Sequence, residues 1–140
     1  MDYQQSRAYI RDAEQYAGGA LDLTNIKEIM KRLGNPQDQL KYVHVAGTNG
    51  KGSVIAYLYT TLTNAGYHVG RYISPSVYSY REKIEVEGTP ISREQFAKHT
   101  TRVAAVIEEM TAEGLAHPTP FEIETAVAFL FFAEEKCDPV

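Results

Sequence analysis

The chain has 140 residues, which supports one domain with a sizeable core, and 44% of them are hydrophobic, as in ordinary globular proteins. No stretch approaches the roughly 20 apolar residues of a membrane span, and a net charge of −4 without a Lys/Arg block disfavours a nucleic-acid-binding surface. Cys137 is the single cysteine, which excludes an intrachain disulfide. We therefore expect a cytoplasmic protein that binds neither nucleic acid nor membrane.

The first 40 residues are predicted to be helical. Good helix formers occupy residues 3–16 and stop at the breaker Gly18-Gly19. A second helix is expected to begin after Thr24, a candidate N-cap, and to end at the turn sequence GNP of residues 34–36.

A strand, a helix and a second strand are predicted next. YVHVAG, residues 42–47, is a short β-branched run typical of a buried parallel strand, in which His44 would be a core residue. Residues 53–65 have the pattern of a helix, and HVGRYIS, residues 68–74, that of a second strand. This order is a βαβ unit and predicts an α/β fold with a mainly parallel sheet flanked by helices.

Another strand and two helices are predicted in the second half. EKIEVEG, residues 82–88, alternates like a half-exposed or edge strand. Ser92, with Gln95 at the capping-box position, opens a helix. The last helix is apolar nearly all round over residues 126–133 and should be buried. The chain stops at CDPV, residues 137–140, where a doubly wound fold would begin its next strand, so we expect an N-terminal fragment of a longer protein.

A glycine-rich loop, AGTNGKGS, occupies residues 46–53 between the first predicted strand and its helix. It departs from the phosphate-loop pattern G-x-x-x-x-G-K-[ST], because Gly52 follows Lys51 where a hydroxyl residue is required, and Val45 replaces the first glycine. The missing hydroxyl argues against a kinase or GTPase.

The loop still meets the physical requirements for binding phosphate. Gly47, Gly50 and Gly52 let backbone N–H groups converge on an anion. Lys51 supplies a positive charge, and Ser53 lies at the positive end of the following helix. A glycine-rich turn without a ligand is the alternative interpretation.

Three ordered segments resemble the Mur ligase superfamily, in particular folylpolyglutamate synthases, including those that also act as dihydrofolate synthases. Residues 46–53 are similar to the family's phosphate loop. Residues 66–92 are similar to the next segment, in which Ser-Pro leads to a charged stretch, and residues 119–132 to a third. The resemblance implies a Mur ligase-like ATP-binding domain. We expect residues 1–40 to form an N-terminal helical segment and residues 41–140 the first part of this ATP-binding domain, with the C-terminal domain absent.

The resemblance implies an ATP-dependent ligase that uses ATP and Mg²⁺. ATP would phosphorylate a carboxylate of folate or dihydropteroate, and the amine of L-glutamate would attack the acyl phosphate to form an amide. We expect the full-length enzyme to be a monomer. Another Mur-type amino-acid ligase, acting on a cell-wall precursor, and a non-catalytic nucleotide-binding module remain alternatives.

Nucleotide and metal residues follow from the resemblance by position. Lys51 would be the catalytic group near the terminal phosphates, and Ser53 and Ser74 would be magnesium ligands. The residues that would bind the ATP phosphates are Gly47, Thr48, Asn49, Gly50, Lys51, Gly52 and Ser53.

The same comparison implies two groups of substrate residues. The segment expected to contact the pteroate consists of Thr119, Pro120, Phe121 and Glu122. A looser alignment adds Ala20, Leu21 and Asp22 as pterin contacts. Thr119 and Glu122 have a second reading, as a capping box at the start of a helix, and both readings can hold together.

The chain also departs from the family pattern. Ser76 stands where many relatives have a histidine after Ser-Pro. The family's second magnesium ligand, a glutamate, and the C-terminal domain would lie beyond Val140, so we expect the 140-residue piece to be inactive alone. The charged residues 81–83 would either reach the substrate or form a solvated face.

Overall fold

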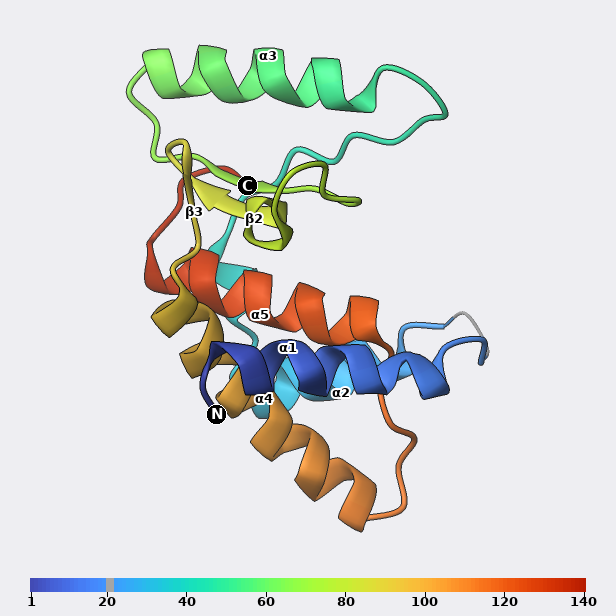
Figure 1. The fold of residues 1–140 in the computed structure, drawn as a ribbon. Helices are drawn as coiled ribbons and strands as arrows, with labels where there is room; N and C mark the ends of the chain where they lie inside the picture. Colours follow the sequence, from blue (N-terminus) through green and yellow to red (C-terminus); the bar gives the residue numbers. More distant parts are fainter. Residues whose placement is uncertain (20–21) are drawn as a thin grey trace. The chain divides into compact units, whose positions relative to one another are not determined.

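The structure, a computed structural model, describes residues 1–19 and 22–140 (Figure 1). It contains two compact units, each built from two chain segments. A helical unit combines residues 1–37 with residues 92–131, and a sheet unit combines residues 38–91 with residues 132–140. The boundaries of these units differ from the predicted division between residues 1–40 and 41–140. That division concerns domains and stays a prediction. No helix in the described ranges is both long and apolar enough to cross a membrane.

The helical unit is organised around helix α4 (Arg93–Ala112), which contacts both α1 (Tyr3–Asp12) and α2 (Thr24–Arg32). Helix α5 (Pro120–Glu134) supplies the most apolar surface, so its predicted burial is confirmed. The side chains of the unit that are no more than 1% exposed include Ile29, Phe96, Val103, Ile107, Met110, Ile123 and Val127.

Local side-chain hydrogen bonds mark where these helices begin. The predicted capping box of α4 is confirmed, because the backbone N–H of Gln95 donates to Ser92 Oγ at 3.0 Å. The prediction that Thr24 caps α2 is wrong. Thr24 is already helical, and its backbone N–H donates to the carboxylate of Asp22 at 2.9 Å.

The sheet unit contains α3 (Lys51–Asn64) and, among the described residues, a three-stranded antiparallel sheet. Its strands β1 (Gly70–Tyr72), β2 (Ile84–Val86) and β3 (Thr89–Pro90) lie in that order. Ile84 and Val86 are buried, which confirms the alternation predicted for this segment. The edge position is wrong, because β2 pairs with a strand on each side.

The parallel strand predicted at residues 42–47 is not formed. Parallel pairing among the described residues is limited to a bridge between Lys41 and Pro139, extended by the Val43 N–H, which donates to Val140 O at 2.9 Å. A strand depends on ladder hydrogen bonds with a neighbour, and the rest of the segment has no such bonds here. His44, predicted to be a core residue, is exposed for the same reason.

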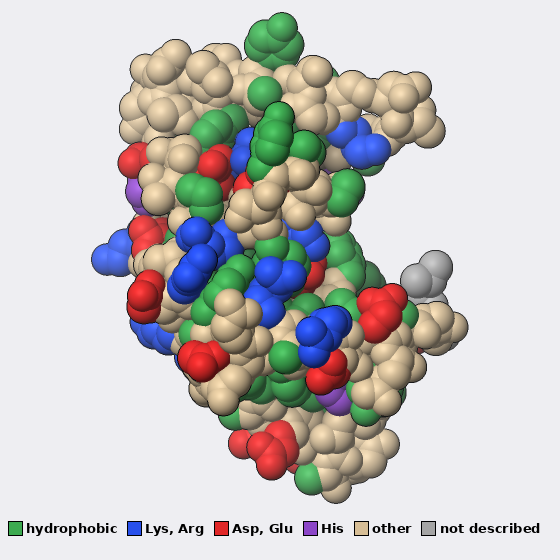
Figure 2. Space-filling view, in the orientation of Figure 1, with side chains coloured by type: hydrophobic (Ala, Val, Ile, Leu, Met, Phe, Trp, Pro, Cys, Tyr) green, Lys and Arg blue, Asp and Glu red, His purple; other side chains and the backbone are tan. Residues whose placement is uncertain are grey.

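Helix α3 confirms the helix predicted at residues 53–65, with a start two residues earlier. It is apolar, yet none of its residues is buried. Tyr57 is 77% exposed, and Figure 2 shows hydrophobic side chains at the surface of the α3 region. The helix is therefore attached to its unit by a small number of specific contacts, which matter for the site at its N-terminus.

Candidate nucleotide-binding site

The phosphate loop turns sharply into α3 through two glycines with positive φ. Gly50 is the N-cap of α3 with φ 80°, and Gly47 has φ 150°. These backbone conformations are strained for residues with a Cβ, so the glycines allow the turn itself. All residues from 46 to 54 in this loop and first helical turn are exposed. The Val54 N–H already donates to Gly50 O at 3.1 Å inside the helix, so the N–H groups suited to an anion are those of the loop before it.

Lys51 folds back across the loop. Its Nζ donates a hydrogen bond to the carbonyl oxygen of Gly47, so the ammonium lies beside the loop that it follows in sequence. No side chain caps α3, and its first turn contains no acidic residue. Because the first N–H groups of a helix have no intrahelical partner, the loop, the helix end and Lys51 together make a positive environment for phosphate.

Ser74 lies after the end of β1 in the same unit and is exposed. It precedes Pro75 through a cis peptide bond and begins a loop that reaches residue 79. Glu82 organises this loop, because its Oε1 accepts the backbone N–H of Tyr78 at 2.7 Å and also that of Val77. These hydrogen bonds lower the pKa of the Glu82 carboxyl, and the one from Tyr78 has the largest effect.

The two charged neighbours of Glu82 also contact other parts of the same unit. Arg81 Nη1 donates to the carbonyl oxygen of Ile91 at 2.9 Å, and Lys83 Nζ lies 4.6 Å from the ring centroid of Tyr80. The charged residues 81–83 are thus part of the loop architecture rather than a freely solvated face.

The predicted pteroate segment starts α5 in the helical unit. The backbone N–H of Thr119 donates to Glu122 Oε2 at 2.8 Å, and the N–H of Glu122 donates to Thr119 Oγ1 at 3.4 Å. This is the reciprocal capping box that the second reading of these residues predicts. Phe121, by contrast, is 59% exposed, so its ring is accessible to a ligand.

Of the three residues in the looser pterin alignment, the structure describes Asp22. Asp22 is exposed, and the hydrogen bond from the Thr24 backbone N–H lowers the pKa of its carboxyl. Ala20 and Leu21 lie outside the described residues. The structure therefore gives Asp22 a local role at the start of α2, and its substrate role stays a prediction.

A protein-only metal centre is not present in the described ranges 1–19 and 22–140, where no three His, Cys, Asp or Glu side chains gather. The predicted Mg²⁺ ligands are the hydroxyl oxygens of Ser53 and Ser74, and both residues are exposed. Hydroxyls suit a hard cation that keeps most of its water and is also bound by phosphate oxygens.

Comparisons with known proteins give a consistent result, although no family model matches the chain. The dihydrofolate synthase/folylpolyglutamate synthase of Bacillus subtilis is 40% identical over 132 residues, which are 94% of this chain and 30% of that protein. The solved folylpolyglutamate synthetase of Lactobacillus casei is 33% identical with a TM-score of 0.91 and covers 99% of this chain and 35% of that one. The Thermotoga maritima structure gives 35% identity and a TM-score of 0.87, over 98% of this chain and 31% of that one.

The chain belongs to the folylpolyglutamate/dihydrofolate synthase family. The resemblance and the Mur ligase-like α/β fold class are thereby confirmed. Among residues 1–19 and 22–140, the mainly parallel pairing that we expected is limited to the bridge between Lys41 and Pro139. The chain spans about a third of the length of two of these relatives, namely 30% of the Bacillus subtilis synthase and 32% of the Lacticaseibacillus casei folylpolyglutamate synthase.

Two residues near the site were missed by sequence reasoning. Tyr59 of α3 and Arg71 of β1 contact each other, with the Arg71 guanidinium carbon 5.7 Å from the Tyr59 ring centroid. Each is unremarkable in sequence, as a tyrosine in an apolar helix and an arginine in a short strand. Their pairing depends on how α3 packs on the sheet, which no local pattern encodes.

Proposed function

We propose that this chain forms the phosphate-binding part of an ATP-dependent ligase that adds L-glutamate to folate or dihydropteroate. The main supporting observation is the geometry of the loop at α3, where Lys51 reaches back to Gly47 beside an uncapped helix N-terminus. Solved relatives are described as complexes of folylpolyglutamate synthase with AMPPCP, with AMPPCP and folate, and with ADP. Those ligands are the kinds of molecule that the proposed function requires.

The proposed chemistry has two steps. A substrate carboxylate oxygen attacks the terminal phosphorus of ATP, and the bond to the ADP oxygen breaks, which gives an acyl phosphate and ADP. The amine of glutamate then attacks the carbonyl carbon, phosphate leaves, and the amine loses a proton to form the amide. The protein contributes positioning and charge neutralisation to the phosphoryl transfer. Lys51 and the N–H groups of the loop are the groups in this chain suited to that task.

Magnesium fits the chemistry of the two serine donors proposed for it. Ser53 and Ser74 each offer one neutral hydroxyl oxygen, so they would hold a largely hydrated Mg²⁺ that shares its coordination with phosphate oxygens. When bound, Mg²⁺ neutralises negative charge on the phosphates. The remaining loop residues Thr48 and Asn49 are exposed beside Gly50 and belong to the same proposed phosphate site.

The helical unit carries the proposed substrate contacts. Phe121 would stack on the pterin or benzoyl ring, and Glu122 would accept hydrogen bonds from pterin N–H groups. Asp22 would assist from the loop before α2. We further propose that the protein works as a cytoplasmic monomer on these small molecules, without nucleic acid or membrane partners. Size-exclusion chromatography with light scattering tests the monomer directly.

Nucleotide binding tests the central claim. The 140-residue chain should bind Mg·AMPPCP in a calorimetric titration, and Lys51→Ala should weaken that binding at least about tenfold, because one charge-assisted contact to phosphate is lost. Lys27→Ala, which removes an exposed lysine from α2, is the matched control and should bind like wild type. Equal affinity of wild type and Lys51→Ala would overturn the proposal.

A further inference from the structure

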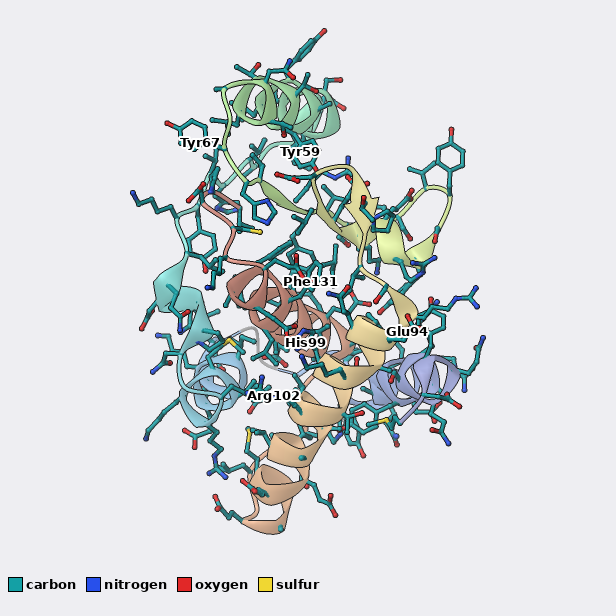
Figure 3. All side chains as sticks on the ribbon, turned by 90° about the vertical axis from the view of Figure 1, so that its left-hand side faces the viewer. Tyr59, Tyr67, Glu94, His99, Arg102 and Phe131 are labelled. Carbon is teal, nitrogen blue, oxygen red and sulfur yellow. The ribbon has the colours of Figure 1, made fainter. Side chains whose placement is uncertain are left out.

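Tyr59 attaches the phosphate-loop helix to the sheet. It lies on the side of α3 that faces the strands (Figure 3). Its hydroxyl oxygen accepts a hydrogen bond from the backbone N–H of Gly88, in the turn between β2 and β3. Its ring lies against the guanidinium of Arg71 at 5.7 Å, a distance at which a cation and an aromatic face attract each other. Tyr59 thus contacts both strand β1, through Arg71, and the turn between β2 and β3, through Gly88.

Arg71 is itself fixed by the sheet. It lies directly opposite Glu85 in the β1–β2 register, and its Nη2 is 2.9 Å from Glu85 Oε2. The two side chains are only 23% and 12% exposed, so solvent screens this ion pair less than it would a pair on the open surface. Arg71 Nη2 also lies 3.5 Å from the carbonyl oxygen of Glu82, the residue that organises the loop after Ser74.

The other attachments of α3 are weak by comparison. No residue of the helix is buried, and Ile55, Leu58 and Leu62 line a half-open, largely apolar pocket of about 60 Å³, to which Tyr59 also contributes, rather than a filled core. A cavity removes partner atoms from the side chains that line it, so dispersion contacts there are incomplete. The hydrogen bond and the cation–π contact of Tyr59 therefore carry a large share of what fixes the helix in place.

We infer that Tyr59 and Arg71 are positioning residues, which together fix α3 so that the phosphate loop keeps a set distance from Ser74. A helix is stiff, and Tyr59 lies eight residues after Lys51, or about 12 Å along the axis. Arg71 lies three residues before Ser74, a span of at most about 10 Å of extended chain. Loosening this contact lets the helix tilt and moves the loop away from Ser74. The inference rests on the proposed nucleotide site.

Conservative variants of the 140-residue chain test the inference. Tyr59→Phe removes only the hydroxyl, and Arg71→Lys keeps the charge opposite Glu85 but loses the planar group over the ring. Tyr57→Phe is the matched control, because it removes a hydroxyl from a tyrosine that is 77% exposed on the same helix. Two quantities are measured for each: hydrogen exchange of the α3 amides in the free chain, and the Kd for Mg·AMPPCP.

Both main variants should raise α3 exchange about tenfold and the Kd about fivefold, while the control changes neither. The rise in exchange should be confined to α3. Unchanged α3 exchange in Tyr59→Phe overturns the attachment, and an unchanged Kd with faster exchange overturns the positioning role. A uniform rise across the chain would mean general destabilisation and also overturns it. If wild type fails to bind Mg·AMPPCP, the proposed function and the positioning role fall, whereas faster α3 exchange would still support the attachment.

Discussion

Gly70 of β1 lies against the ring of Phe132, in the last part of α5. A Cβ built on Gly70 would come within 2.6 Å of Phe132 Cδ1 and 3.2 Å of Cys137 Sγ. Real Cβ atoms do not approach other atoms so closely, so the strand can run beside this ring only because residue 70 has no side chain. Phe132 is fully buried and cannot easily move aside.

Gly70→Ala should therefore destabilise the fold by about 1–3 kcal/mol, the usual cost of overpacking a core. Urea denaturation followed by circular dichroism measures the change. Gly19→Ala is the control, because a Cβ there meets nothing within 4 Å and the residue has no positive φ. A wild-type midpoint for Gly70→Ala would show that the ring can shift at no cost.

Gly52→Ala should separate folding from nucleotide binding. A Cβ on Gly52 meets nothing within 4 Å, and the residue lies inside α3, so alanine should leave stability unchanged or raise it by up to about 1 kcal/mol. The same methyl group would obstruct the approach of phosphate to the loop N–H groups, so Mg·AMPPCP affinity should fall. Denaturation and calorimetry on one preparation give both values. Unaltered affinity would mean that phosphate does not approach at Gly52.

His68 should make stability depend on pH. Its Nδ1 lies 2.7 Å from Glu87 Oε1, and this hydrogen bond is the main cause that raises the His68 pKa above 6.5, with Glu135 contributing less. A raised folded-state pKa stabilises the fold fully below the unfolded value, and the contribution is lost as the pH rises through the folded value. The carboxylate of Asp138 also faces this site and accepts the His68 backbone N–H at 3.4 Å.

The measurement is the urea midpoint at about pH 6 and about pH 8, on either side of the ordinary histidine range. Wild type should lose stability at the higher pH, and Glu87→Gln should lose less. Glu109→Gln, which alters an exposed glutamate of α4, should behave like wild type. An equal loss in wild type and Glu87→Gln would rule out this pair as the source.

The start of α5 should separate a capping role from a substrate role. Thr119→Ala removes the acceptor of the Glu122 N–H and should cost about 1 kcal/mol of stability, as for other N-caps. Phe121→Ala should cost less, because that ring is 59% exposed, yet it should weaken binding of a pteroate compound. Binding of the pteroate compound to wild type and to Phe121→Ala is measured by calorimetric titration. Normal pteroate binding by Phe121→Ala would remove it from the proposed substrate site.

The sequence by itself determined the features that depend on a few neighbouring residues. The glycine-rich loop at Lys51 was recognisable because φ preferences, a helix start and a charge are encoded within eight residues. The capping boxes at Ser92 and Thr119 were recognisable because a cap joins residues three apart. The family assignment followed from three ordered segments, residues 46–53, 66–92 and 119–132, and the comparisons confirmed it.

Only the tertiary structure decided which segments pair with which. The run at residues 42–47 has strand propensity, but a strand also needs a ladder partner, and pairing stops near Val43. The register that sets Arg71 opposite Glu85, and the packing that brings Tyr59 to Arg71, join residues that are 14 and 12 apart in sequence. Such contacts depend on chain topology and burial rather than on local propensity, which is why no sequence pattern predicted them.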